Sequence, residues 1–130
     1  MERRSLIILD THAWIWWIDS PEELGSDARC ALRIAKRIGV SAISCWEFAL
    51  LVARGRIREA DPLNWIEEAL AQPRIEILPL SPAVAVRAAG IGPPADPADR
   101  IIMATALLEA APLVTRDESI RRHPSLKTIW

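Results

Sequence analysis

Short apolar runs alternate along this chain with longer segments whose apolar residues recur at helical spacing. The first run, residues 5–9, has no polar face and ends abruptly at Asp10. Such a run is typical of a strand buried on both faces, as in a parallel sheet covered by helices. Comparable runs predict four further strands, over residues 40–43, 74–78, 112–115 and 127–130.

The segments between these runs predict helices over residues 11–19, 27–37, 45–52, 62–71, 83–89, 99–108 and 118–122. Ser26 and Ser44 are predicted as N-caps, and Gly39 is predicted to end the second helix. Asp61 and Ser81 are each followed by proline, which favours a helix start at both positions. Strands that alternate with helices throughout predict an α/β fold with a parallel sheet.

The chain has 130 residues, of which 51% are hydrophobic, and a formal net charge of −1. This composition suits one folded domain with a sizeable core, and the charge gives no general argument for nucleic-acid binding. No apolar run approaches the roughly 20 residues that span a bilayer, and no signal-peptide pattern follows the opening residues 1–4. A cytoplasmic protein with no membrane contact is therefore expected. Cys30 and Cys45 are predicted to be reduced thiols within the core.

Four acidic residues stand where predicted strands end or predicted helices begin: Asp10, Glu47, Asp99 and Asp117. Each alone has an ordinary explanation as a helix cap, a partner of a helix dipole or a solvated loop residue. The carboxyl ends of parallel strands share one edge of the sheet, so a common site explains all four better than four coincidences. Clustered carboxylates repel unless a cation is present, and hard oxygen ligands suit Mg²⁺ or Mn²⁺. Such an ion can activate water for attack on a phosphodiester.

His12 and His123 are isolated, and surface or capping roles are predicted for both.

Four ordered stretches carry a family resemblance: Ile8-Leu9-Asp10-Thr11-His12, residues 40–47, residues 96–102, and Leu113-Val114-Thr115-Arg116-Asp117. Together they resemble the PIN domain, in the branch of the VapC toxins of bacterial type II toxin–antitoxin pairs. The resemblance implies a single PIN domain over residues 1–130, folded as a three-layer α/β/α sandwich with a central parallel sheet of four to five strands. One departure is Pro94, which stands where relatives often carry a histidine.

The resemblance also implies the activity of an Mg²⁺- or Mn²⁺-dependent endoribonuclease, which hydrolyses RNA with metal-activated water. The catalytic and metal-binding residues carry over as the four acids, with Asp10 and Asp99 as direct ligands and Glu47 and Asp117 completing the pocket. Five further residues match positions around them: Thr11, Ser44 and Thr115 as braces for the carboxylates, Asp96 as a loop anchor or auxiliary acid, and Arg100 as the partner of a carboxylate or of RNA phosphate.

The same branch implies two protein partners. One is a cognate VapB-type antitoxin whose C-terminal segment lies across the active site, and the other is a second copy in a homodimer. Six tryptophans exceed what a core of this size easily hides. Some of four tryptophans are therefore expected to line a groove for the antitoxin, with ordinary core or dimer roles for the others: Trp14, Trp16, Trp17 and Trp65.

Three other interpretations stay open. A phosphoaspartyl hydrolase of the haloacid-dehalogenase type would use Asp10 as its nucleophile, but the second acid expected two residues on is replaced by His12. A receiver-type signalling module would need a lysine near the site, and Lys36 and Lys127 are poorly placed for that role. A catalytically silent PIN fold kept only for binding is the third, and the presence of all four acids argues against such decay.

Overall fold

A parallel sheet forms the centre of the computed structural model, which describes residues 5–130. Its strand order is β3-β2-β1-β4-β5, and every neighbouring pair is parallel. The strands are β1 (Leu6–Leu9), β2 (Arg37–Ser41), β3 (Ile75–Leu78), β4 (Leu113–Val114) and β5 (Thr128–Ile129). The predicted parallel sheet of four to five strands is confirmed. Residues 1–4, where no signal peptide is expected, lie outside the described part of the chain.

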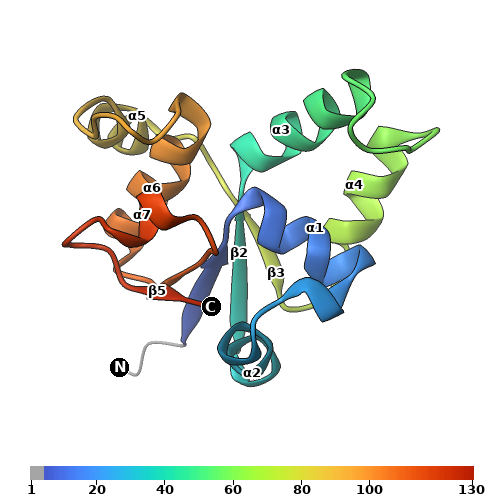
Figure 1. Ribbon diagram of the computed structural model, residues 1–130, viewed down its shortest axis with the longest axis horizontal. Coiled ribbons are helices and arrows are strands. Elements are labelled where there is room, and N and C mark those ends of the chain that lie inside the picture. The colour runs from blue at the N-terminus through green and yellow to red at the C-terminus, as the bar shows by residue number, and fades with distance from the viewer. Residues whose placement is uncertain (1–4) are drawn as a thin grey trace.

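Helices cover both faces of this sheet, as the three layers in Figure 1 show. One layer holds α1 (Thr11–Asp19), α2 (Ser26–Ile34), α3 (Ala42–Ala53) and α4 (Pro62–Leu70), with a short 3-10 turn at Pro21–Glu23. The other layer holds α5 (Pro82–Ala89), α6 (Pro97–Glu109) and α7 (Glu118–Arg121). The predicted α/β/α sandwich is therefore confirmed.

The first strand is apolar on both sides because it serves both cores. Ile7 and Leu9 pack with the layer of α1–α4, whereas Ile8 packs with the layer of α5–α7. Successive side chains of a strand point to opposite faces, so an unbroken apolar run is what a doubly covered strand requires. The interpretation of residues 5–9 as a strand buried on both faces is confirmed.

The predicted boundary between the second helix and the second strand was wrong. Gly39 was expected to end a helix, but α2 ends at Ile34 and Gly39 lies inside β2. A Cβ atom on Gly39 would lie 2.6 Å from Cδ1 of Leu78 and 3.3 Å from Cγ1 of Ile8. Glycine at this position reflects close packing beside the strand, and that requirement is invisible in the local sequence.

Two predicted N-caps also need correction. Gly25 occupies the cap position of α2, and the side chain of Ser26 makes no cap bond. Ser41, not Ser44, caps α3, since its Oγ accepts a hydrogen bond from the Ile43 amide at 3.2 Å. The caps predicted ahead of prolines are confirmed: the side chains of the residues before Pro62 and Pro82 accept hydrogen bonds from helix amides.

The core decides between the roles left open for Trp14 and corrects the position predicted for Cys30. Trp14 is completely buried, so it cannot line a groove for a partner. Its ring lies edge-on to those of Phe48 and Trp65, which stack on each other with centroids 4.0 Å apart. Both cysteines carry free thiols as predicted, but Cys30 is exposed and only Cys45 is partly buried.

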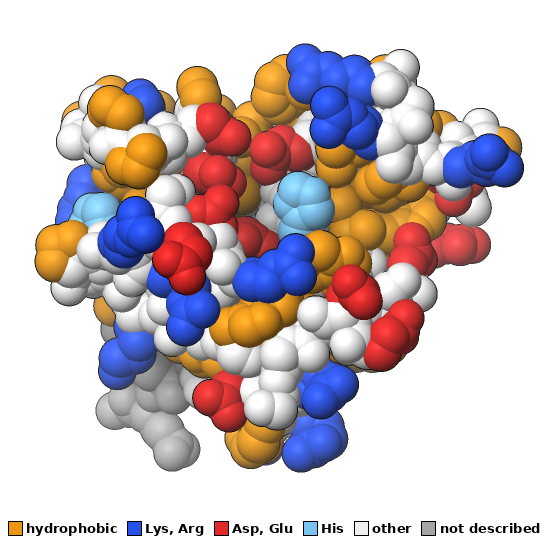
Figure 2. Space-filling model, viewed as in Figure 1, with side chains coloured by type: hydrophobic (Ala, Val, Ile, Leu, Met, Phe, Trp, Pro, Cys, Tyr) orange, Lys and Arg blue, Asp and Glu red, His pale blue; other side chains and the backbone are white. Residues whose placement is uncertain are grey.

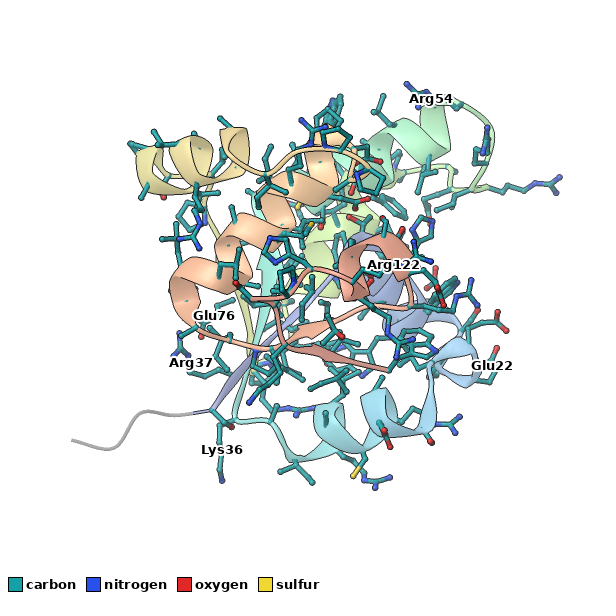
Figure 3. All side chains as sticks on the ribbon, turned by 60° about the vertical axis from the view of Figure 1, so that its left-hand side comes forward. Glu22, Lys36, Arg37, Arg54, Glu76 and Arg122 are labelled. Atoms are coloured by element: carbon teal, nitrogen blue, oxygen red, sulfur yellow. The ribbon has the colours of Figure 1, made fainter. Side chains whose placement is uncertain are left out.

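An ion pair joins β2 to β3 on the surface. The guanidinium of Arg37 donates to both carboxylate oxygens of Glu76, at 2.6 and 2.7 Å, and the two side chains lie together in Figure 3. Paired N–H donors of this kind favour the ionised carboxylate, so the pKa of Glu76 is lowered.

In the described range, no helix combines the length and the apolar character needed to cross a membrane.

The aromatic cluster gives the first testable prediction. Replacing Phe48, which is 0% exposed, by alanine leaves a cavity against two tryptophan rings and is expected to lower the free energy of unfolding by about 3–5 kcal/mol. Trp46→Ala, on the same helix but 55% exposed, is the matched control and is expected to have little effect. Urea unfolding measures both, and equal losses would contradict the prediction.

Candidate active site

A hollow of about 410 Å³ opens at the carboxyl ends of the strands. In Figure 2 acidic side chains gather in the depression at the centre of the face, with histidine and basic side chains along its margin. Nine residues line it: Asp10, Thr11, His12, Trp16, Glu47, Asp96, Asp99, Arg116 and Asp117. The four acids singled out in the sequence thus face a single space, together with Asp96.

Helix capping explains how three of these acids are placed. Asp10 follows β1 directly, and its Oδ1 accepts the amide of Ala13 at 2.9 Å as the N-cap of α1. Asp96 caps α6 in the same way, and Asp117 caps α7. A capping carboxylate is fixed by the backbone of the helix that it begins. The helix-cap explanation is therefore correct for these residues, and it is also the means by which they converge.

The other two acids are carried on helices without capping them. Glu47 is in the second turn of α3, because the helix begins after Ser41 and not after Ser44 as predicted. The dipole acts mainly on the first turn of a helix, so it explains less of the position of Glu47. Asp99 is in the first turn of α6, where its amide is bound by Oδ1 of Asp96 at 2.9 Å. Their carboxylates are left to face the hollow.

The hydroxyl groups of Thr11, Ser44 and Thr115, for which a bracing role was predicted, are buried at the site. The hydroxyl of Thr11 donates to Oε1 of Glu47, and the Ser44 hydroxyl lies 2.8 Å from the same Thr11 oxygen. Since Thr11 has one hydroxyl hydrogen, Ser44 donates to Thr11 while Thr11 donates to Glu47. This chain of hydrogen bonds ties α1 to α3 across the floor of the site.

Thr115 has the same role on the other side. Its Oγ1 accepts the amide of Asp117 at 3.1 Å, which holds the turn between β4 and α7. The same hydroxyl favours the ionised form of Asp10 and opposes the rise in the pKa of Asp10 that burial causes. Hydroxyl groups that orient ligating carboxylates are the usual support of a metal site.

Burial, together with crowding of like charge, raises the pKa of Asp99 to about 7. Burial of the carboxyl group is the largest cause, and the negative charges of Asp96, Glu47, Asp117 and Asp10 add to it in that order. A carboxylic acid that still holds its proton near neutral pH needs an added cation to become fully ionised. The hollow therefore favours binding of positive charge.

The pKa values of two neighbouring carboxyl groups shift in opposite directions. Burial raises the pKa of Glu47, and the hydrogen bond from Thr11 partly offsets the rise. The hydroxyl of Ser119 instead lowers the pKa of Asp117, which is close to solvent. In the range 5–130, the recorded ion pairs involve none of the acids in the hollow. Their charges are left for something outside the chain.

The donor set fits a hydrated divalent cation. Every acid here offers hard oxygen atoms, which Mg²⁺ and Mn²⁺ prefer. Within the described residues, no three Asp, Glu, His or Cys side chains converge closely enough to enclose an ion by themselves. Mg²⁺ characteristically keeps several waters and takes one or two protein carboxylates, so an open arrangement of this kind suits it.

Arg100 does not lie with the acids. Its Nε donates to the carbonyl of Ala95 at 2.7 Å, and it is absent from the lining of the hollow. No ion pair of Arg100 is recorded in the described part of the chain. Of the two roles expected for Arg100, a carboxylate partner is not seen among the described residues, and contact with RNA phosphate stays a prediction.

Three residues of the hollow were not assigned to a site from the sequence: His12, Trp16 and Arg116. His12 was expected at the surface and is exposed, but it is exposed into the hollow. Trp16 was one of the four tryptophans expected either to line a groove for the antitoxin or to have a core or dimer role. A usable signal was present, since His12 and Arg116 directly adjoin residues of the predicted site.

Comparisons with known proteins agree with this geometry. The family model for the PIN domain matches residues 7–126. Ribonuclease VapC22 of Mycobacterium tuberculosis is 38% identical over 129 residues, covering 95% of this chain and 98% of that protein. The structure of DNA-bound VapBC from Salmonella typhimurium has a TM-score of 0.72 at 21% identity, covering 95% of this chain and 96% of that chain. FitAcB from Neisseria gonorrhoeae has a TM-score of 0.64 at 25% identity, covering 94% and 95% respectively.

The raised pKa of Asp99 predicts how stability depends on pH. Between the unfolded pKa of 3.8 and the folded value of about 7, the folded chain holds a proton that the unfolded chain has released. Stability contributed by this group therefore falls as pH rises through that window. In chelator, Asp99→Asn is expected to gain a few degrees in Tm over wild type between pH 5 and pH 8.

Added Mg²⁺ supplies the control. It is expected to reduce the difference in Tm between Asp99→Asn and wild type at pH 8, because a cation favours the ionised carboxylate of the wild type. A Tm difference that stays constant from pH 5 to pH 8 in chelator would contradict the assignment.

Proposed function

This chain belongs to the PIN domain family, and from that premise we propose that it is a divalent-metal-dependent endoribonuclease, the toxin of a VapBC-type toxin–antitoxin pair. The observation that carries the proposal is the convergence of Asp10, Glu47, Asp99 and Asp117 on one open hollow. The ribonuclease named for the relative at 38% identity supports the same activity for this chain.

In this proposal Mg²⁺ or Mn²⁺ is held by Asp10 and Asp99, with Glu47 and Asp117 acting directly or through water. When bound, the ion supplies positive charge for the phosphodiester and makes a water molecule more acidic. The residues of the chain provide the setting. The amide of Ala13 keeps one oxygen of Asp10 fixed, so the other oxygen is free to face the hollow.

Two side chains, Thr11 and Asp99, have further roles in this proposal. Thr11 holds the Glu47 carboxylate at the floor of the site, which fixes its orientation toward a substrate. Asp99, with a pKa of about 7, releases its proton when positive charge enters. Protons and cation compete at this residue, and activity is therefore expected to decline below neutral pH.

The rival chemistries gain no support from the site. A receiver-type module would place a lysine near the acceptor, and the lining of the hollow, within residues 5–130, includes none. His12 occupies the position of the second acid that the hydrolase reading needs. The silent binding module differs from the proposed enzyme only in activity, so the cleavage experiment below distinguishes them.

We further propose a VapB-type antitoxin as the partner and a homodimer as the assembly of the toxin. Support comes from the similar solved structures, which are described as VapBC complexes. Exposed Trp46 on α3 and Leu63 on α4 also give an apolar surface. An arginine of the antitoxin would be electrostatically suited to the acidic hollow.

Cleavage of total cellular RNA tests the proposed activity. The purified chain is expected to produce discrete fragments with Mg²⁺ or Mn²⁺ and none in chelator. Asp10→Asn and Asp99→Asn should each reduce cleavage by at least roughly 100-fold, because each removes a metal-binding charge. Asparagine at position 10 still caps α1, so the fold is expected to be kept.

Asp61→Asn is the matched control for this experiment. Asp61 caps α4 as Asp10 caps α1, but it is not part of the lining of the hollow. Full cleavage by this control excludes a general effect of losing a capping charge. Wild type that stays folded and inactive with either ion would overturn the nuclease proposal in favour of the binding module.

Purification from the native source tests the antitoxin. A second polypeptide is expected in stoichiometric amount, and its removal under denaturing conditions followed by refolding should restore RNA cleavage. A chain that is isolated alone and already active would contradict the proposed partner.

A further inference from the structure

One side of the hollow is aromatic and cationic, in contrast to its acidic floor. We call this side the aromatic wall and define it as His12, Trp16 and Arg116, with Trp130 behind them. The guanidinium carbon of Arg116 lies 4.6 Å from the ring centroid of Trp16 and 6.0 Å from that of Trp130. The rings of His12 and Trp16 lie 5.6 Å apart.

The wall is assembled from distant parts of the chain. His12 and Trp16 come from the first two turns of α1, Arg116 follows β4, and Trp130 follows β5. The pairing of β1 with β4, and of β4 with β5, brings these parts to the same edge of the sheet. The rings of Trp16 and Trp130 meet edge to face at 5.9 Å, so the wall has its own internal packing.

Packing alone does not account for Arg116. It is exposed, and within the described residues no hydrogen bond or ion pair is recorded for its side chain. Acids line the hollow beside it, yet the guanidinium lies against aromatic rings. A cation held in this way keeps its charge and its N–H donors available to a ligand.

A second cation–aromatic pair on the same helix shows what a structural arrangement looks like. Arg74 lies 5.9 Å from the ring of Trp17, away from the acidic hollow. Its guanidinium is occupied, since it donates to the carbonyls of Leu32 and Ala35 at 2.7 and 2.9 Å. Arg74 therefore joins elements of the fold, whereas Arg116 is left unoccupied at the site.

Planar rings next to an unoccupied guanidinium are the combination that holds an unpaired nucleobase. Bases stack on aromatic side chains and on arginine planes, and the positive charge attracts the adjoining phosphate. A base inside a duplex has both faces covered by its neighbours and is not available for such stacking.

We propose that His12, Trp16 and Arg116 form a nucleobase-binding subsite beside the acidic hollow, so that the chain cuts RNA next to an unpaired nucleotide. This proposal rests on the ribonuclease function proposed above, and it names the form of RNA that the site accepts. Arg116 and Trp16 are positioning residues in this scheme, because they hold the nucleotide and not the reacting water.

Binding of a short fluorescent RNA, single-stranded and of mixed sequence, tests the subsite without cleavage. The protein carries Asp10→Asn, and the Kd is measured in the presence of Mg²⁺. Adding Trp16→Leu is expected to weaken binding roughly 5- to 100-fold, the range that loss of one stacking partner produces. Trp16→Phe keeps a ring and is expected to recover part of the affinity.

Matched controls separate the subsite from effects on folding and charge. Trp17→Leu removes the neighbouring half-buried tryptophan of the same helix, and it is expected to leave the Kd within about two-fold. Arg116→Gln is expected to weaken binding more than Arg122→Gln, because Arg122, labelled in Figure 3, is not part of the lining of the hollow and its side chain pairs with Glu118. Equal effects of Trp16→Leu and Trp17→Leu would overturn the proposal.

Cleavage by the wild-type chain gives the second readout. Removing one base beside the cut, or annealing a complementary strand across it, is expected to raise KM by about the same factor as Trp16→Leu raises Kd. In the Trp16→Leu variant, removing that base should raise KM little further. Wild type that cuts paired and abasic RNA as well as the intact single strand would overturn the subsite and leave the nuclease function standing. Wild type that cuts no RNA would overturn the nuclease function, and the binding measurement would still decide the subsite.

Discussion

Repulsion among carboxylates is the constraint on which the rest of this site depends. Five acids face one hollow, and burial, with their mutual charge added to it, raises the pKa of Asp99 to about 7. A folded chain relieves such repulsion by protonation, by separation or by binding a cation. This chain uses the first two, because the acids are spaced around the hollow and do not enclose an ion alone.

The parallel sheet explains how the acids come to lie together despite their repulsion. Every strand end points to the same edge, and a helix begins just beyond β1, β2 and β4. Helix starts need acceptors for their free amides. Asp10 and Asp117 meet that need beyond β1 and β4, and Asp96 meets it at the start of α6, which follows α5. Thr11 and Thr115 then supply hydroxyl groups at the tips of β1 and β4. The same local rules that begin the helices also place the acids.

Much of this could be predicted from the sequence because it follows from local patterns. The buried run before Asp10 and the acid beyond residues 112–115 both signal a strand that ends at the site, and the family resemblance agrees with the 38% identical relative. The errors have a different origin. Gly39 resembles a helix stop until the contact with Leu78 is seen, and that contact joins β2 to a strand far along the chain.

The aromatic wall was missed for a related reason. Trp16 and Arg116 are far apart in the sequence, and only the order of strands brings them together. A tryptophan at helical spacing is most simply explained by core packing, and the fully buried Trp14 on the same helix fits that explanation. Tertiary arrangement, and no local signal, decides which tryptophan of α1 reaches the hollow.

The double role of the capping acids has a consequence for how such a gene changes over generations. A single base change in an aspartate codon gives asparagine, and asparagine caps a helix about as well as aspartate. At Asp10, Asp96 or Asp117 this one step removes a negative charge from the hollow and leaves the helix start intact. Loss of activity is therefore separable from loss of fold. For the toxin proposed above, this gives a cell short mutational routes to an inactive chain that would still bind the proposed antitoxin.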